Sequence, residues 1–179
     1  MNAIVVLEGA NNVGKSTIAS SLKEKLELLY PGIEVVIHHD SDLYDDVKES
    51  SSDEYFYMCL EKARRKRYAE FCMCDILILD RSFVSTLVYD FNYTYTKEQI
   101  VYIYNEIKSL QQNSNIPLLF FNITRFDSED VEKSLCHTYQ VVFESLISDF
   151  HMNVTHIDNQ DVSESVSRII EELQLEKVV

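Results

Sequence analysis

The chain has 179 residues, of which 46% are hydrophobic and 26% are charged, a balance typical of one soluble globular domain over residues 1–179. Its net charge of −14 argues against a protein that binds a nucleic-acid backbone, including a polynucleotide kinase, because such binding needs clustered lysine and arginine. No apolar run is long enough to cross a membrane, and the first one ends early at Glu8, so neither a membrane partner nor a signal peptide is expected. The four cysteines include no CxxC pair, which favours reduced thiols and a cytoplasmic setting.

Taken in chain order, short apolar runs alternate with segments in which apolar residues have helical spacing. Strands are predicted at residues 2–8, 33–39, 75–80, 116–124 and 152–158. Helices are predicted at residues 16–30, 53–71, 82–90, 96–110, 128–150 and 163–173. The acidic, serine-rich segment 41–54 is predicted to be a mobile loop. Because each strand is a continuous apolar run, the pattern favours an α/β fold, with a five-stranded parallel sheet and helices on both faces.

The stretch LEGANNVGKST follows the first strand and contains two of the only three glycines in the chain. Gly9, Gly14, Lys15 and Ser16 fit the phosphate-binding pattern GxxxxGK[ST], in which backbone N–H groups surround a phosphate at the N-terminus of a helix. The strand and the helix that this motif requires are both predicted around it. The residues expected to bind ATP are Gly9, Ala10, Asn11, Asn12, Val13, Gly14, Lys15, Ser16 and Thr17.

The third strand ends in Asp80, which Arg81 follows directly. At the carboxyl end of a parallel strand, the Asp80 carboxylate can hold Mg²⁺ through water while the Ser16 hydroxyl ligates the same ion. The Arg81 guanidinium can neutralise charge on a phosphoryl group in the transition state. A GTPase is less favoured, because the sequence has no NKxD guanine motif.

Three segments together resemble the thymidylate kinase family. The loop VLEGANNVGKST is similar to the family's FEGxDGxGKST, DRSFVSTLVY to its DR(Y/F)xxSxxAY, and HIDNQDVSESVSRIIEEL to its IDAxxxxEEVxxxI tail. The resemblance implies a P-loop kinase with a five-stranded parallel sheet. It also implies transfer of the ATP γ-phosphate to a nucleoside monophosphate (dTMP + ATP to dTDP + ADP), a role in nucleotide biosynthesis, Mg²⁺ as the metal and a homodimer.

Carried over residue by residue, the resemblance assigns catalysis to Lys15 and Arg81. The positions that it assigns to the acceptor are Asn11, Arg64, Arg81, Ser85 and Asp90. The sequence also departs from the family. Asn11 replaces an aspartate that contacts the sugar, and Asp90 replaces a glutamine that contacts the base, so base preference is left open. A short lid is expected near residues 124–135, where only one arginine, Arg125, is present.

The region after the second strand keeps a second function open. The family has an arginine there for the acceptor phosphate, but this sequence reads IHHDSD. Deoxynucleoside kinases carry a carboxylate at this place as general base, because a sugar hydroxyl loses a proton when it attacks. Asp40 is the candidate for that base. A non-catalytic regulator that binds nucleotide is a third hypothesis, and Asp40 and Arg64 can also be ordinary surface charges.

Overall fold

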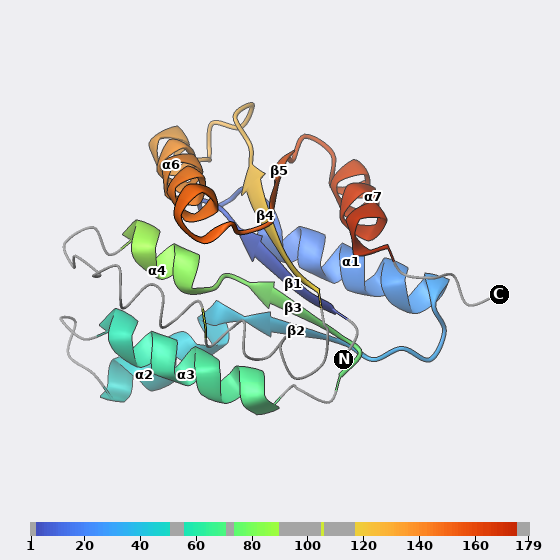
Figure 1. Cartoon of the computed structure of the whole chain (residues 1–179), viewed down its shortest axis with the longest axis horizontal. Coiled ribbons are helices and arrows are strands. Elements are labelled where there is room, and N and C mark those ends of the chain that lie inside the picture. Colours follow the sequence, from blue (N-terminus) through green and yellow to red (C-terminus); the bar gives the residue numbers. More distant parts are fainter. Residues whose placement is uncertain (1–2, 51–55, 71–73, 90–104, 106–116, 175–179) are drawn as a thin grey trace.

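The computed structural model describes residues 3–50, 56–70, 74–89, 105 and 117–174. Five strands form one parallel sheet in the order β2-β3-β1-β4-β5 (Figure 1). The strands are β1 (Ala3–Glu8), β2 (Val35–His39), β3 (Ile76–Asp80), β4 (Leu118–Thr124) and β5 (Val154–Asp158). All five strand predictions and the predicted fold class are therefore confirmed.

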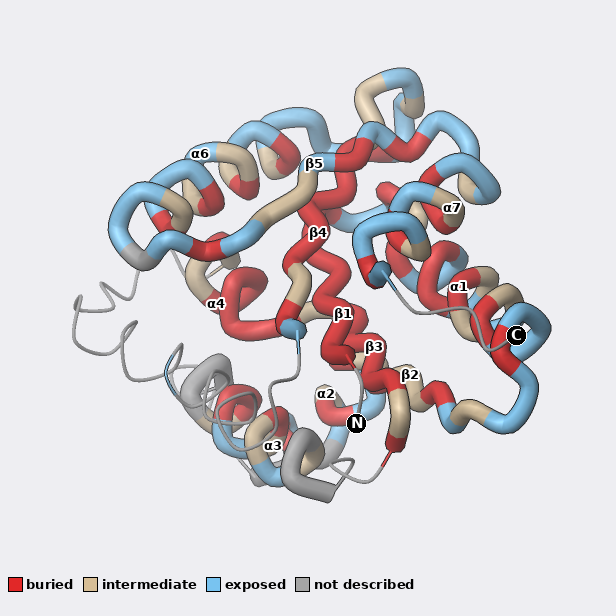
Figure 2. Tube along the Cα trace, turned by 45° about the vertical axis from the view of Figure 1, so that its right-hand side comes forward, coloured by how far each residue is buried: buried red, intermediate tan, exposed pale blue. Residues whose placement is uncertain are grey.

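Helices cover both faces of the sheet (Figure 1). One face packs against α1 (Lys15–Leu29) and α7 (Val162–Leu173), and the other packs against α4 (Phe83–Tyr89) and α6 (Lys133–Phe150). Two further helices, α2 (Tyr44–Ser50) and α3 (Phe56–Glu70), pack together through Val47 and Leu60, joined by Leu43 just before α2. The central strand β1 is buried along its whole length (Figure 2), as expected for a strand covered on both sides.

The register of the sheet brings polar strand ends to one edge. Leu7 of β1 is paired with Asp80 of β3, which is also paired with His39 of β2. On the other side of β1, Glu8 is paired with Asn122 of β4. The helix α1 begins beside this same edge, so that the sheet and the helix N-terminus face one region. In open parallel sheets, ligands bind at this carboxyl edge.

Two secondary-structure predictions were wrong in detail. The segment 41–54 was predicted to be a loop, but it contains the 3-10 helix η1 (Asp40–Leu43) and α2, because Leu43 and Val47 are buried against α3. The helix predicted from residue 128 begins only at Lys133, since Glu132 before it has an extended backbone. The predicted helix 96–110 lies outside the described residues, apart from Asn105.

Within the part of the chain that the structure describes, no helix is long and apolar enough to span a membrane.

Candidate active site

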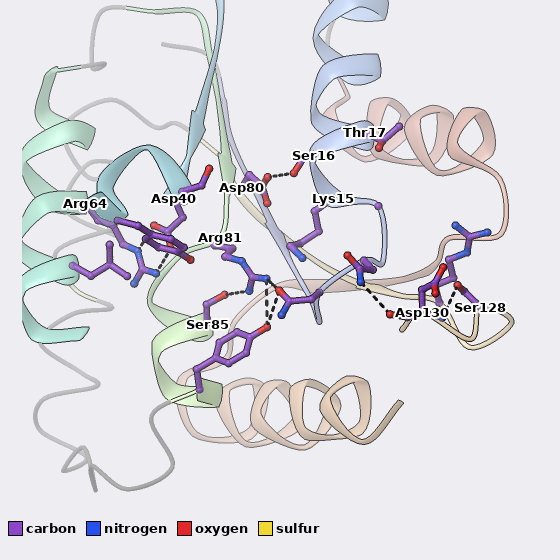
Figure 3. Close-up of a pocket in the computed structure, with 18 of the residues that line it drawn as sticks. Lys15, Ser16, Thr17, Asp40, Arg64, Asp80, Arg81, Ser85, Ser128 and Asp130 are labelled. Carbon is purple, nitrogen blue, oxygen red and sulfur yellow. Dashed lines mark hydrogen bonds and ion pairs between the residues drawn. The ribbon is translucent and has the colours of Figure 1, made fainter. Parts of the chain in front are cut away.

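A cavity of about 1040 Å³ opens at the carboxyl edge of the sheet. It is lined by the loop before α1 and the first turn of α1, by the end of β3, by η1, α2, α3 and α4, and by the segment that joins β4 to α6. Arg64 and Asp40 lie at one end and Ser128 and Asp130 at the other, with Lys15 and Arg81 between them (Figure 3). A site of this size and shape can hold two small molecules side by side.

The loop before α1 has the backbone that a phosphate cradle needs. Gly9 and Gly14 have φ angles of 144° and 93°, and Asn12 has a φ of 62°. A Cβ atom at Gly9 would lie 2.2 Å from the Ile123 carbonyl oxygen, so no other residue fits there without a shift. The buried Asn159, after β5, donates from Nδ2 to the Val13 carbonyl oxygen at 2.7 Å and holds the loop from behind.

Lys15 is held inside this cradle. Its Nζ donates to the carbonyl oxygens of Gly9 at 3.0 Å and Ala10 at 2.7 Å, and its side chain is buried. Burial lowers the pKa of Lys15 to about 8, and the nearby Arg81 charge adds to this effect. An anion in the cradle would favour the charged lysine, so the loop is set up for phosphate.

Ser16, Asp80 and His39 form a hydrogen-bonded group next to the cradle. Asp80 Oδ2 accepts from Ser16 Oγ at 2.6 Å (Figure 3) and lies 3.0 Å from His39 Nδ1. Hydroxyl and carboxylate oxygens are ligands that Mg²⁺ accepts, alongside phosphate and water oxygens. The described residues hold no cluster of three or more His, Cys, Asp or Glu side chains suited to a metal. The Ser16 hydroxyl and the Asp80 carboxylate are the two oxygen ligands that this group would offer to Mg²⁺.

Arg81 sits at the centre of the cavity in an unusual backbone conformation. Its φ is 87°, in the left-handed region, and its backbone N–H donates to the Leu7 carbonyl oxygen at 3.0 Å. Strained backbone of this kind persists only where surrounding contacts hold it, and it is common at functional sites. The guanidinium donates to Tyr139 OH at 2.9 Å and to Asn11 Oδ1 at 2.7 Å, and it lies 5.2 Å from the centre of the Tyr89 ring.

Arg64, another arginine of the cavity, is surrounded by carboxylates. Arg64 is 1% exposed and forms a two-pronged ion pair with Asp40, with Nε–Oδ1 at 2.7 Å and Nη2–Oδ2 at 2.5 Å. It also forms an ion pair with Glu61 and donates to Thr86 Oγ1 at 2.6 Å. Two carboxylates therefore offset one guanidinium charge. Among the described residues, the hydrogen-bond acceptors of Arg81 are all uncharged, so its positive charge stays directed into the cavity.

This contrast predicts a structural role for Arg64 that can be measured. Replacing Arg64 with methionine leaves Asp40 and Glu61 buried without their cation, so we expect a loss of about 3 kcal/mol in the free energy of unfolding. Urea denaturation at pH 7 measures this loss. The neighbouring variant Lys62→Met, at an exposed position of the same helix, is the control and should change stability by less than about 0.5 kcal/mol. A stable Arg64→Met variant would contradict the buried ion-pair network.

The structure brings most of the predicted site residues together. The loop residues, Asp80 and Arg81 meet at the cavity as predicted, while Asp40, Arg64 and Ser85 are buried in its wall. The Ser85 hydroxyl is bonded within the protein, to Glu8 at 2.6 Å and to Arg81 at 3.0 Å. Asp90 lies outside the described residues.

Four residues that hold parts of the site together by hydrogen bonds were missed by the sequence analysis. They are Glu8, His39, Tyr139 and Asn159. Glu8 and His39 end apolar strands next to predicted site residues, which is a weak signal in the sequence. Tyr139 and Asn159 come from distant segments, and nothing in the sequence brings them to the loop.

The fold has solved relatives, although no protein-family model and no curated protein sequence matches the chain. A thymidylate kinase from Ehrlichia chaffeensis is similar with a TM-score of 0.66 at 16% identity, over 97% of this chain and 99% of that one. A thymidylate kinase from Candida albicans is similar with a TM-score of 0.56 at 17% identity, over 97% and 91% of the two chains.

The YorR protein from Bacillus subtilis, solved in complex with phosphorylated GDP, is similar with a TM-score of 0.57 at 17% identity, over 97% and 96% of the two chains. The three proteins match almost the full length of the chain, and their shared architecture is the one described above. The chain therefore has the α/β P-loop fold of the thymidylate kinases.

Proposed function

We propose that the protein is a nucleotide kinase that transfers the γ-phosphate of ATP to a (deoxy)nucleoside monophosphate, in the manner of thymidylate kinase. The observation that carries this proposal is the Arg81 guanidinium, which donates to uncharged acceptors in the described part of the chain, beside a phosphate-binding loop. Phosphoryl transfer needs positioned positive charge far more than it needs an acid or a base. The similarity to two thymidylate kinases supports the same activity.

In this proposal, residues 9–17 bind the ATP phosphates, with Lys15 against the outer phosphates. Ser16 and Asp80 hold Mg²⁺, which draws negative charge from the phosphate oxygens when it is bound. Arg81 bridges the transferred phosphoryl group and the acceptor. Asn11, Arg64, Ser85 and Asp90 remain proposed acceptor residues, with Arg64 and Ser85 acting from the cavity wall.

The nature of the acceptor depends on Asp40. A general base must lie within hydrogen-bond reach of the hydroxyl that it deprotonates, with an oxygen free to accept the proton. Both Asp40 oxygens receive Arg64 N–H groups, and the residue is 2% exposed. These contacts favour a structural role for Asp40 in the wall of the cavity. Without a general base, the favoured acceptor is a monophosphate, because its phosphate oxygens are already charged and need no base.

The segment 125–132, between β4 and α6, is the proposed lid, within the predicted region 124–135. Arg125, Ser128 and Asp130 of this segment line the cavity, and the Asp130 carbonyl oxygen accepts from Asn12 Nδ2 at 3.1 Å. A contact between this segment and the phosphate loop suits a lid over bound nucleotide. The homodimer, the cytoplasmic location and the role in nucleotide biosynthesis stay predictions from the resemblance.

The test is phosphoryl transfer from ATP and Mg²⁺ to dTMP, thymidine and the other nucleosides and monophosphates. We expect monophosphates to react and nucleosides not to. We also expect Asp40→Asn to retain kcat within about tenfold of the wild type, because the residue is not a base. Asp42→Asn, at an exposed position in η1, is the matched control.

Two outcomes would reject the proposal. If nucleosides react and Asp40→Asn abolishes that activity while Asp42→Asn does not, the protein is a nucleoside kinase with Asp40 as base. If ATP is bound but no acceptor is phosphorylated, the protein is a nucleotide-binding regulator.

A further inference from the structure

We propose that Tyr139, on α6, positions the Arg81 guanidinium for phosphoryl transfer, through a chain of hydrogen bonds that ends at the buried carboxyl group of Glu8. This inference rests on the proposed function, because it assigns Tyr139 a part in the chemistry of Arg81. Tyr139 is not proposed to touch either substrate. It acts on the reaction only through the arginine.

The chain of hydrogen bonds is short and continuous. Arg81 Nη1 lies 2.9 Å from Tyr139 OH and 3.0 Å from Ser85 Oγ, and these two oxygens are 2.8 Å apart. Ser85 Oγ lies 2.6 Å from Glu8 Oε2. Tyr139 and Glu8 are both fully buried. No water is needed to connect the guanidinium to the carboxyl group.

The donors around Glu8 fix the direction of these bonds. Glu8 Oε1 accepts from the Ser82 backbone N–H and hydroxyl, both at 2.6 Å, and from the Ser85 backbone N–H at 3.3 Å. The Ser85 hydroxyl donates its single proton to Oε2. When Glu8 is ionised, Tyr139 therefore donates to Ser85 Oγ, and its own oxygen accepts from Arg81. Positive charge at one end of the chain is linked to the carboxyl group at the other by two hydroxyls.

This arrangement anchors Arg81 without placing a carboxylate on it. Burial raises the pKa of Glu8, and the hydrogen bonds from Ser82 and Ser85 oppose that rise. A direct ion pair with Glu8 would offset the guanidinium charge, as Asp40 and Glu61 do for Arg64. Tyr139 fixes the orientation of the group and is itself uncharged, because burial raises the pKa of its phenol well above the ordinary value. The charge is thus held in place and left available for phosphate.

Of the described hydrogen-bond partners of Arg81 Nη1, Tyr139 is the one that belongs to α6. Ser85 lies only four residues after Arg81, so a contact between these two residues is local in the chain. Tyr139 is 58 residues away in sequence, and it reaches Arg81 because α6 packs against α4. The left-handed backbone at Arg81 is strained and needs surrounding contacts to hold it. The hydrogen bond with Tyr139 is one such contact from outside the local segment.

The test is the variant Tyr139→Phe, which removes one hydroxyl and keeps the ring. We expect kcat with the best acceptor to fall by about 10-fold to 100-fold. A small displacement of a charged catalytic group from its productive position can lower the rate by this much. We expect KM for ATP to stay within about twofold, since Tyr139 is absent from the phosphate loop. An unchanged kcat would overturn the proposal.

Phe143→Leu is the matched control, one helical turn further along α6 and equally buried in the apolar core. It should lower the melting temperature and leave kcat within about twofold of the wild type. A kcat loss in Phe143→Leu as large as that in Tyr139→Phe would show that α6 packing alone is responsible, and would overturn the role of the hydroxyl.

A double-mutant cycle separates positioning of Arg81 from other effects. In an Arg81→Lys background, the ammonium cannot make the same set of contacts, so adding Tyr139→Phe should lower kcat by less than about twofold further. A full, multiplicative loss in the double variant would mean that Tyr139 does not act through Arg81, and would overturn the proposal.

A spectroscopic readout keeps this inference distinct from the proposed function. The guanidinium N–H signals of Arg81, assigned by their loss in Arg81→Lys, should exchange slowly with solvent in the wild type and faster in Tyr139→Phe. If the wild type phosphorylates no acceptor, the proposed function fails whatever these signals show. If the signals do not respond to Tyr139→Phe, the positioning role fails even in an active enzyme.

Discussion

Replacing Arg81 with alanine is expected to lower kcat for phosphoryl transfer by about 10³-fold or more. An arginine on the transferred phosphoryl group contributes in this range in kinases and GTPases. In this chain the expectation is strengthened by the absence of a carboxylate among the described hydrogen-bond partners of Arg81. Steady-state kinetics with ATP, Mg²⁺ and the preferred monophosphate measures the loss.

The fold should survive this substitution. Alanine tolerates the left-handed backbone no better than arginine, but it adds no bulk, and the Glu8 contacts to Ser82 and Ser85 remain. The control is Arg168→Ala, an exposed position on α7 that removes the same charge. Arg168→Ala should keep kcat within about twofold. Near-native kcat in a folded Arg81→Ala protein would contradict both the proposed function and the role of Tyr139.

The parts of the site that were predicted from sequence are those whose chemistry is local. The phosphate loop is encoded within eleven consecutive residues, and its glycines have the positive φ angles that the motif requires. Asp80 and Arg81 were predicted from their place after a buried strand. In a parallel sheet all such strand ends meet at one edge, so the topology brings them to the loop without further information.

The parts that were not predicted depend on packing between distant segments. The pair of Asp40 and Arg64 spans 24 residues and forms because α3, which was predicted, packs on η1 and α2, which lie in a segment predicted to be a loop. Tyr139 lies within a strongly helical segment, where a tyrosine reads as a core residue, and its hydroxyl matters only once α6 lies beside Arg81. Such contacts follow from the tertiary arrangement, which periodicity and motif spacing do not specify.

Replacing Lys15 with methionine is expected to abolish most activity while making the nucleotide-free protein more stable at neutral pH. Removing a preorganised charge from the outer phosphates should lower kcat by about 10²-fold to 10³-fold. Without nucleotide, however, Lys15 is a buried cation whose pKa is lowered from 10.5 to about 8. A shift of this size means that keeping the charge costs the folded state about 3 kcal/mol.

The sign of the pH dependence follows from this shift. Below pH 8 both the folded and the unfolded protein carry the charge, so the full cost is present. Between pH 8 and 10.5 the folded state loses the proton first, the unfolded chain binds more protons, and wild-type stability rises with pH through this one group. By pH 10 the cost of the charge has fallen to about 1 kcal/mol.

Methionine also removes two hydrogen bonds, from Lys15 Nζ to the Gly9 and Ala10 carbonyl oxygens, each contributing about 1 kcal/mol. Lys15→Met should therefore be more stable than the wild type by about 1 kcal/mol at pH 7 and less stable by a similar amount at pH 10. Groups that do not interact with Lys15 titrate alike in both proteins and cancel in the difference. Urea denaturation at the two pH values, without nucleotide, measures this reversal. A stability difference that is the same at both pH values would show that the charge of Lys15 does not destabilise the nucleotide-free protein.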